Sequence, residues 1–233
     1  MSDGSLRRLE RGQDPSDWEQ LVSVRLRTGA LAPERVAVAA FLRGEPIAGV
    51  EPIQAQLESQ EEDSPAAVLR TALSTGNLKR ALLVELSCDY AEHALAQVEH
   101  RVERPAHLLR AIQRIRLCAL GEDSEEKALA ALEDAFEARE EGTVCASQCL
   151  GSVVYAGEAL AKPSPGESAA EAANQASLAI GNQAGGYTSH ELEEQERAWQ
   201  TRHTIRVLLG VEVPLPSPPR EGFLRRIFRS FRG

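Results

Sequence analysis

The sequence predicts an all-α protein, a multi-helix bundle, and three observations support this class. Apolar residues recur at spacings of three and four along most of residues 78–210, Gly and Pro interrupt the pattern at intervals, and aromatic residues make up only 4% of the 233 residues. Ala-rich segments of this kind favour packing of helix on helix over sheets, which use β-branched and aromatic side chains. The same interruptions divide the chain into a disordered N-terminus (1–15), a helical hairpin with its connector (16–76), the main bundle (77–210), a Pro-rich linker (211–222) and a short amphipathic basic helix as a tail (223–233).

The first two helices are predicted at about 17–28 and 33–42, where they form a short hairpin. Ser16 and Glu19 have the spacing of a capping box at the start of the first helix. A loop with one weak helical turn is expected over 45–64, followed by a short helix over 65–74. Glycines follow four of the predicted helices and are expected to end them (Gly29, Gly44, Gly121 and Gly142).

The main bundle is expected to contain five or six helices. They are predicted at about 78–102, 105–120, 125–140, 144–161, 168–184 and 188–209. Pro105 restarts the chain after the first of them, and Ser124 can cap the third. Thr188 with Glu191 has capping-box spacing before the last helix.

The charge of the chain is uneven. The whole sequence has a net charge of −9; residues 214–233 contain five Arg and one Glu, so residues 1–213 contain 21 basic and 34 acidic residues, a net charge of −13. An acidic body repels phosphate backbones, so no nucleic-acid partner is expected. The N-terminus lacks the apolar segment of an export signal, and we therefore expect a cytoplasmic protein with reduced cysteines.

A search for catalytic, metal-binding and cofactor-binding residues predicts none. No Glu-x-x-His occurs, which excludes the usual di-iron carboxylate bundle, and no Cys-x-x-Cys occurs. His93, His100 and His107 are spaced by seven, and we interpret them as surface or boundary residues, with a metal or pH-sensing role as the alternative. Cys145 and Cys149 are interpreted as small core residues. The sequence therefore favours a protein that is not an enzyme.

One set of residues in the bundle forms a pattern in chain order: Cys88, Asp89, Tyr90, Arg104, Pro105, Glu196, Trp199 and Gln200. With two Ala-rich helices between its halves, this order resembles the immunity proteins of bacterial polymorphic toxin systems, over about residues 78–210. The resemblance implies a compact cytoplasmic bundle that neutralises a cognate toxin. It also implies that the eight residues organise the bundle first and contact a partner second. The chain departs from the family pattern in the polar helix 172–184, where an Ala/His-rich helix is typical.

The C-terminal tail has two faces. If residues 223–232 are helical, their apolar members lie within an arc of about 140° and their arginines opposite. The apolar members are Phe223, Leu224, Ile227, Phe228 and Phe231, and the arginines are Arg225, Arg226, Arg229 and Arg232. Such a tail can fold back on the acidic body, lie on an anionic membrane at the inner face of the cell, or dock in the groove of a partner.

Two functions of a non-catalytic, protein-binding bundle follow. The first is an immunity protein whose protein partner is a basic toxin. The alternative is a helical adaptor or scaffold that is localised through its amphipathic tail. A toxin gene beside this one would favour the first, and a gene for a membrane complex or the cytoskeleton would favour the second.

Overall fold

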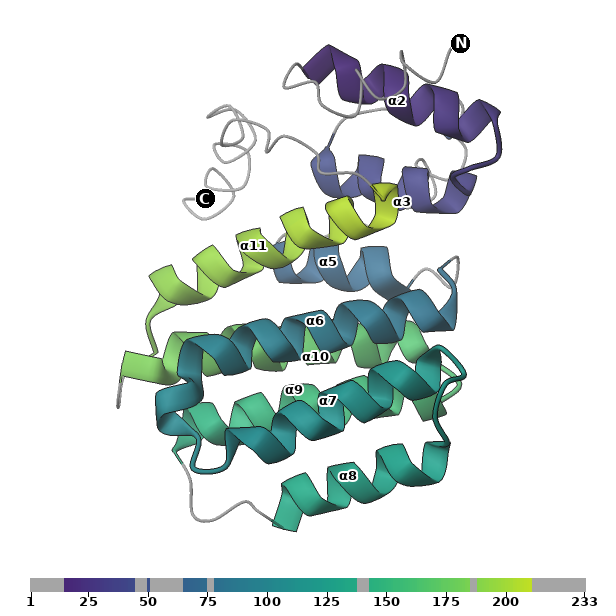
Figure 1. The fold of residues 1–233 in the computed structure, drawn as a ribbon. Coiled ribbons are helices and arrows are strands. Elements are labelled where there is room, and N and C mark those ends of the chain that lie inside the picture. Colours follow the sequence, from purple (N-terminus) through teal and green to yellow (C-terminus); the bar gives the residue numbers. More distant parts are fainter. Residues whose placement is uncertain are drawn as a thin grey trace. The chain divides into compact units, whose positions relative to one another are not determined.

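A computed structural model describes residues 15–44, 50, 65–74, 78–137, 143–184 and 188–210. All regular elements of these residues are helices, which confirms the predicted all-α, multi-helix class (Figure 1). Residues 1–14 of the predicted disordered N-terminus, the predicted Pro-rich linker and the predicted amphipathic tail lie outside the described residues.

The helices follow the predicted order with small changes at their ends. Their bounds are α2 (Pro15–Arg27), α3 (Pro33–Arg43), α5 (Pro65–Ser74), α6 (Arg80–Val98), the 3₁₀ turn η1 (Glu99–Arg101), α7 (Pro105–Ala119), α8 (Glu125–Glu137), α9 (Val144–Ala161), α10 (Pro165–Gly181), the 3₁₀ turn η2 (Asn182–Ala184) and α11 (His190–Leu209). The helix predicted to reach 102 ends at Val98 and is followed by the turn η1, and α10 begins three residues before the predicted 168. Pro165 occupies the first turn there, where its missing N–H costs no helical hydrogen bond.

Three of the four glycine stop signals are confirmed, and the fourth, Gly142, lies outside the described residues. Gly29, Gly44 and Gly121 have φ values of 71°, 67° and 75°, in the left-handed region that side chains with a Cβ rarely adopt. The predicted cap at Ser124 is also confirmed, because the Lys127 backbone N–H donates to Ser124 Oγ over 3.4 Å.

The predicted cap of the last helix was placed one residue too early. Ser189, and not Thr188, accepts a hydrogen bond from a backbone N–H of the first turn of α11, that of Leu192, over 3.4 Å. The Thr188 hydroxyl donates instead to Asn182 Oδ1 over 2.9 Å and does not cap α11.

The chain forms two compact units, the first from residues 1–68 and 201–233 and the second from residues 69–200. In the first unit, arginines of the N-terminal helices bind carbonyl groups at the end of α11. Arg25 Nη1 donates to the Gly210 carbonyl over 2.9 Å and to the Leu209 carbonyl over 3.3 Å. Arg35 Nη2 donates to the Val207 carbonyl. These side chains satisfy carbonyl groups that a helix end otherwise leaves without partners.

The second unit is built around α6, α9 and α10, each of which packs on the other two (Figure 1). Helix α7 lies against α6 and α9, and α8 lies against α7 and α9. Small residues let α9 and α10 approach closely: the buried Ser152 Oγ donates to the Ala172 carbonyl over 2.8 Å. At Gly166, a Cβ would lie 2.3 Å from the Leu73 carbonyl oxygen, so the backbones of α10 and α5 meet there. Close packing of these helices thus requires small side chains, which explains the Ala-rich composition.

Helix α9 is the one helix in the described part of the chain that is long and apolar enough to span a membrane. Its composition has another explanation in this fold, because α9 packs against α6, α7, α8 and α10. A core helix that has neighbours on most sides is apolar around most of its circumference.

Candidate functional site

Four polar and aromatic side chains gather where α6 and α11 meet α10, and we call them the His93–Glu196 cluster: His93, Glu196, Trp199 and Gln200. Glu196 and Gln200 are buried, with 3% and 0% of their surface exposed. The His93 ring stacks on Trp199 with 3.6 Å between ring centroids and 7° between planes. His93 Nδ1 lies 2.9 Å from Glu196 Oε2, at an ion-pair distance but outside the angles of a hydrogen bond.

Gln200 extends the cluster to a third helix. Its Nε2 donates to the Ala173 carbonyl of α10 over 2.8 Å and to Glu196 Oε1 over 3.1 Å. Glu196 and Gln200 are four residues apart, so their side chains lie one turn apart on the same face of α11. Both carboxylate oxygens of Glu196 are therefore engaged by groups of the protein itself.

This arrangement is better suited to holding helices together than to turning over a substrate. A buried carboxylate is stable only when its oxygens have partners, and here the partners come from α6 and α11. The cluster fixes the rotation of α11 relative to α6 and α10 within the second unit, because a turn of α11 would separate Gln200 from the Ala173 carbonyl.

A second polar group joins α6 to α7. Arg116 Nη2 donates to Asp89 Oδ1 over 2.8 Å and to Glu92 Oε2 over 2.9 Å. Asp89 is one of the pattern residues, and its partner Arg116 belongs to the helix that the pattern residues Arg104 and Pro105 begin. The pattern therefore contains Asp89, one member of this ion pair. The other member, Arg116, does not belong to the pattern.

The remaining pattern residues lie in the core or at the start of a helix. Tyr90 and Cys88 are fully buried in α6, and Cys88 Sγ donates to the Ile112 carbonyl of α7 over 3.8 Å. Burial raises the pKa of Cys88 to about 12, so this thiol is neutral at physiological pH and is not an activated nucleophile. Pro105 is the first residue of α7 and Arg104 precedes it as the exposed N-cap residue.

Cys145 and Cys149 are buried, in agreement with the interpretation of both as core residues. Burial, with a smaller contribution from Cys145, raises the pKa of Cys149 to about 12. Within the described residues, no group of three or more His, Cys, Asp and Glu side chains is arranged to hold a metal ion.

Comparison with known proteins adds no assignment, since no family model, curated protein or solved structure matches this chain. The His93–Glu196 cluster must therefore be interpreted from its own contacts.

The sequence pattern contains three of the four cluster residues, and the fourth, His93, is half-buried, as expected for a boundary residue. Glu196, Trp199 and Gln200 belong to the pattern, whereas His93 was grouped with His100 and His107 by their spacing of seven. The structure separates the three histidines, because α6 ends at Val98 and His100 lies in the turn η1. His93 follows the buried Tyr90 by three residues. This helical spacing predicts that His93 lies near the buried face of α6.

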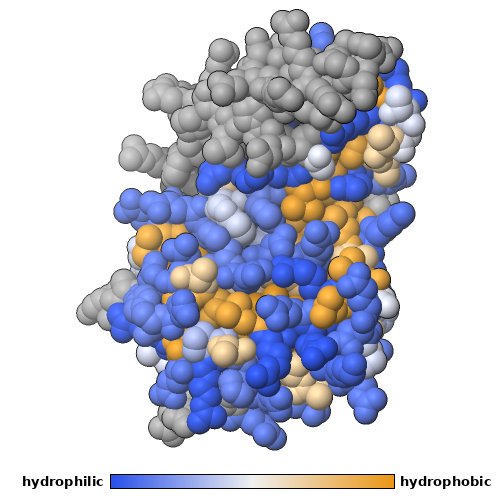
Figure 2. Space-filling model, viewed as in Figure 1, coloured by the Kyte–Doolittle hydropathy of each residue, from blue (hydrophilic) through white to orange (hydrophobic). Residues whose placement is uncertain are grey.

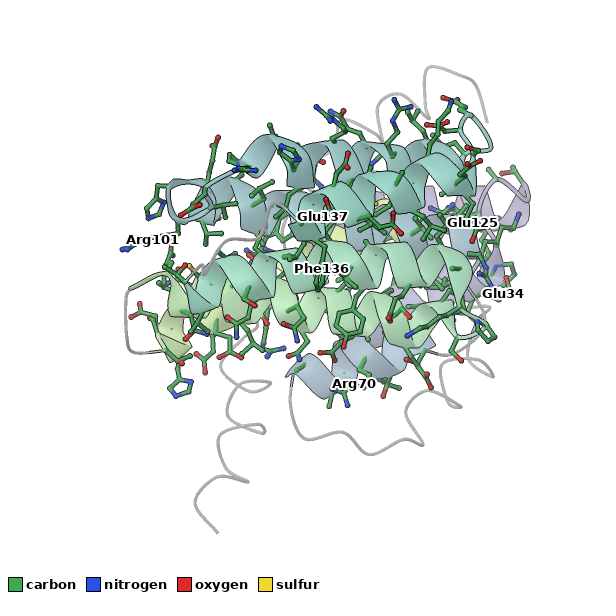
Figure 3. The ribbon with its side chains drawn as sticks, turned by 90° about the horizontal axis from the view of Figure 1, so that it is seen from below. Glu34, Arg70, Arg101, Glu125, Phe136 and Glu137 are labelled. Carbon is green, nitrogen blue, oxygen red and sulfur yellow. The ribbon has the colours of Figure 1, made fainter. Side chains whose placement is uncertain are left out.

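The outer face of α8 is the second surface with a distinct chemistry. Leu129 and Phe136 are large apolar residues that are 50% and 54% exposed. At 100° per residue, Leu129, Leu132 and Phe136 lie within an arc of about 60°. Exposed carboxylates also lie on this helix, namely Glu125, Glu126, Glu133, Asp134 and Glu137. Figure 3 shows Phe136 and Glu137 near the end of α8 and Glu125 near its start.

Helix α8 lies at the edge of the second unit, below α7 and α9 in the view of Figure 1, and packs on these two helices. Its buried face is made of Ala128, Ala131 and Ala135. Small residues on that face bring α8 close to its neighbours. Leu129 and Phe136 are left exposed, whereas Leu132 packs against Gly157 of α9. Figure 2 shows the wider pattern of this unit, in which apolar bands alternate with hydrophilic areas.

Proposed function

We propose that this chain is a non-catalytic, protein-binding helical bundle that acts as an immunity protein and neutralises a basic bacterial toxin in the cytoplasm. The observation that carries the proposal is the outer face of α8, where exposed apolar side chains stand among exposed carboxylates. An interface of this composition excludes water at its apolar centre and selects a basic partner by charge. The family pattern around Cys88 and Glu196 supports the same proposal.

In this proposal the pattern residues and the contact surface are different parts of the second unit. The His93–Glu196 cluster and the Asp89–Arg116 pair hold α6, α7, α10 and α11 in place. The α8 face then offers a fixed surface to the partner. A neutralising protein needs a rigid scaffold and an exposed surface, and it needs no chemistry of its own.

The test is a growth-rescue experiment in which this protein is co-expressed with the product of the neighbouring gene. If that product is toxic, the parent protein should restore growth, and the double variant Leu129→Glu, Phe136→Glu should not. The matched control is Leu120→Glu, which changes an exposed Leu outside α8 that is 64% exposed. A neighbouring toxin that the parent protein neither binds nor neutralises would refute the immunity function.

A second candidate function is an adaptor or scaffold with an N-terminal helical hairpin and a C-terminal tail that places it at the inner face of the membrane. The sequence of residues 223–232 favours it, because four arginines and five large apolar residues occur there together. Sedimentation with anionic vesicles at low salt tests this candidate. A protein without residues 220–233 should stay in the supernatant, and equal sedimentation of both proteins would exclude the tail as the anchor.

A further inference from the structure

The exposed face of α8 carries two parallel rows of different chemistry. The first row is apolar: Leu129 and Phe136 are 50% and 54% exposed, and Leu132 lies between them along the helix, half-buried against Gly157 of α9. We call Leu129, Leu132 and Phe136 the α8 stripe. Leu129 and Phe136 are seven residues apart, which corresponds to about 10.5 Å along the helix axis. Single exposed Leu or Phe side chains are common, whereas a row of them along one helix indicates a binding surface.

The second row is acidic and lies on one side of the stripe only. At 100° per residue, Glu126, Glu133 and Glu137 fall within an arc of about 40° beside the stripe. The other side of the stripe is the Ala face that packs on α7 and α9. In the part of the chain that the structure describes, these three carboxylates form no ion pair, whereas Asp123 before the helix pairs with Lys127. An exposed acidic row without basic neighbours favours a partner that supplies the positive charge.

The two rows indicate which kind of element covers them. An extended strand presents every second side chain on one face, so it offers a single row. A helix presents residues three, four and seven apart on one face, and it can carry an apolar row with a basic row beside it. The face of one amphipathic helix therefore matches both rows of α8 at once.

A second copy of this chain is a poor occupant of the same face. Helix α8 contains five acidic residues and one lysine, a net charge of −4 over 13 residues, so a second α8 would bring like charges together. Two copies that packed antiparallel about a two-fold axis would place their acidic rows on the same side of the contact. The acidic row thus favours a basic helix and opposes self-association.

We propose that α8 binds one basic amphipathic helix of its partner. The apolar side chains of that helix cover the α8 stripe, and its Lys and Arg side chains lie beside Glu126, Glu133 and Glu137. This inference rests on the proposed function, because it names the element of the basic partner that the outer face of α8 receives. Burial of Leu129 and Phe136 supplies affinity, and the acidic row fixes the side on which the positive charges of the partner lie.

The experiment uses the full-length protein and three fluorescent synthetic peptides that share one composition of Ala, Leu and Arg. In the first peptide, Leu recurs at spacings of three and four with Arg in the neighbouring row; in the second, Leu and Arg alternate, as in a strand; in the third, the order is scrambled. We expect fluorescence anisotropy to show that the first peptide binds at least about tenfold more tightly than the others, because its two rows are preorganised on one face. With p-benzoylphenylalanine in its Leu row, it should crosslink to residues 125–137.

Variants of the α8 stripe separate apolar contact from simple attraction between charges. Leu129→Glu, Phe136→Glu should weaken binding of the first peptide by about tenfold or more, because the apolar centre of the contact is lost. The control Leu120→Glu, at an exposed position outside α8, should leave binding unchanged. The new carboxylates of the double variant add attraction for a basic peptide, so tighter binding by that variant would show that charge alone holds the peptide and would overturn the proposal.

A second set of variants tests the acidic row. Neutralising it with Glu126→Gln, Glu133→Gln, Glu137→Gln should weaken binding and reduce its dependence on salt, which screens exposed charges. The matched control neutralises three exposed carboxylates that lie elsewhere: Asp134→Asn, Glu191→Gln, Glu194→Gln. Equal effects of the two triple variants would show that only the net charge matters and would overturn the proposal. Circular dichroism of each variant shows that the helices persist.

Further outcomes separate this inference from the proposed function. Equal binding of the three peptides, no binding, or a crosslink outside α8 would overturn it. So would self-association of the parent protein in sedimentation that Leu129→Glu, Phe136→Glu abolishes, since a second copy would then occupy the face. Growth rescue that depends on the α8 stripe, without preference for the helical peptide, would retain the immunity function and refute a helix as the bound element. Preference for the helical peptide without rescue would refute the immunity function and support α8 as a helix-binding surface.

Discussion

At the residue scale, the contacts of Glu196 determine how its loss affects the second unit. Glu196→Ala removes one of the two acceptors of Gln200 Nε2 and the carboxylate beside His93. Hydrogen bonds to charged groups contribute about 1.5–3 kcal/mol, so we expect the free energy of unfolding to fall by about 2–3 kcal/mol. The matched control is Glu194→Ala, at an exposed position of the same helix, for which a change within about 0.5 kcal/mol is expected.

Urea denaturation of both variants checks this prediction. Equal midpoints for Glu196→Ala and Glu194→Ala would show that the His93–Glu196 cluster does not stabilise the unit. The cluster would then have to be reconsidered as a site that exists for binding.

The buried thiols give a prediction about chemical reactivity. Because burial raises the pKa of both Cys88 and Cys149 to about 12, both are protonated at pH 8 and shielded from reagents. We expect Cys118, which is only partly buried, to be alkylated first in the native protein, and all four cysteines to react in urea. Mass spectrometry of the alkylated peptides measures the order. Modification of Cys88 or Cys149 as fast as Cys118 in the native state would contradict the burial.

The same pKa shift has a consequence at alkaline pH. Folding favours the neutral thiol, so its contribution to stability is complete below about pH 9, the ordinary thiol pKa, and is lost as the pH rises toward 12. The protein should therefore become less stable across this window.

At the scale of single elements, the start of α8 depends on Asp123. Asp123 accepts hydrogen bonds from Arg114 and from the Ser124 backbone N–H, and Lys127 Nζ lies 3.1 Å away. These partners, Arg114 first, lower the pKa of Asp123 to about 2. The ionised form is favoured by folding, so its contribution is present above about pH 3.8 and is lost as the pH falls through 2.

Asp123→Asn should therefore weaken the dependence of stability on pH between 4 and 2, because the variant has no carboxyl group to protonate there. Thermal unfolding at several pH values measures this effect. Asp134→Asn, at an exposed position of α8, serves as the control and should keep the acid dependence of the parent. A parent-like acid dependence in Asp123→Asn would contradict the assigned role.

The elements themselves were largely predictable, and the contacts between them were not. Gly29, Gly44 and Gly121 ended their helices because the left-handed turn there requires a residue without a Cβ, which is a local property of the chain. Thr188 and Ser189 are adjacent candidates for one cap, and the choice depended on Asn182, seven residues before Ser189. The role of His93 depended on α11, a hundred residues away along the chain, and local spacing contains no information about such a contact.

At the scale of the whole molecule, the contribution of α5 to the second unit, which begins at Leu69, can be tested directly. Leu69, Ala72 and Leu73 of α5 are buried, and the Leu73 carbonyl meets Gly166 of α10. We expect a fragment of residues 65–212 to unfold cooperatively and to be more stable than a fragment of residues 76–212 by at least about 2 kcal/mol, the lower range for loss of one buried Leu.

Circular dichroism during thermal unfolding compares the two fragments. Leu73→Ala in the full-length protein is the control, since it removes one of the same apolar side chains without shortening the chain. Equal stability of the two fragments would show that α5 is not needed by the second unit.

The stack of His93 on Trp199 also gives the molecule an optical reporter. Only two tryptophans occur in the sequence, Trp18 and Trp199, so Trp18→Phe leaves a single indole. The emission of that indole depends on an imidazole that α6 holds 3.6 Å away, and it changes as soon as α6 and α11 separate. Fluorescence of this one residue can therefore be compared with circular dichroism during unfolding. A fluorescence change that comes before the loss of helix would show that α11 leaves the second unit before its helices melt.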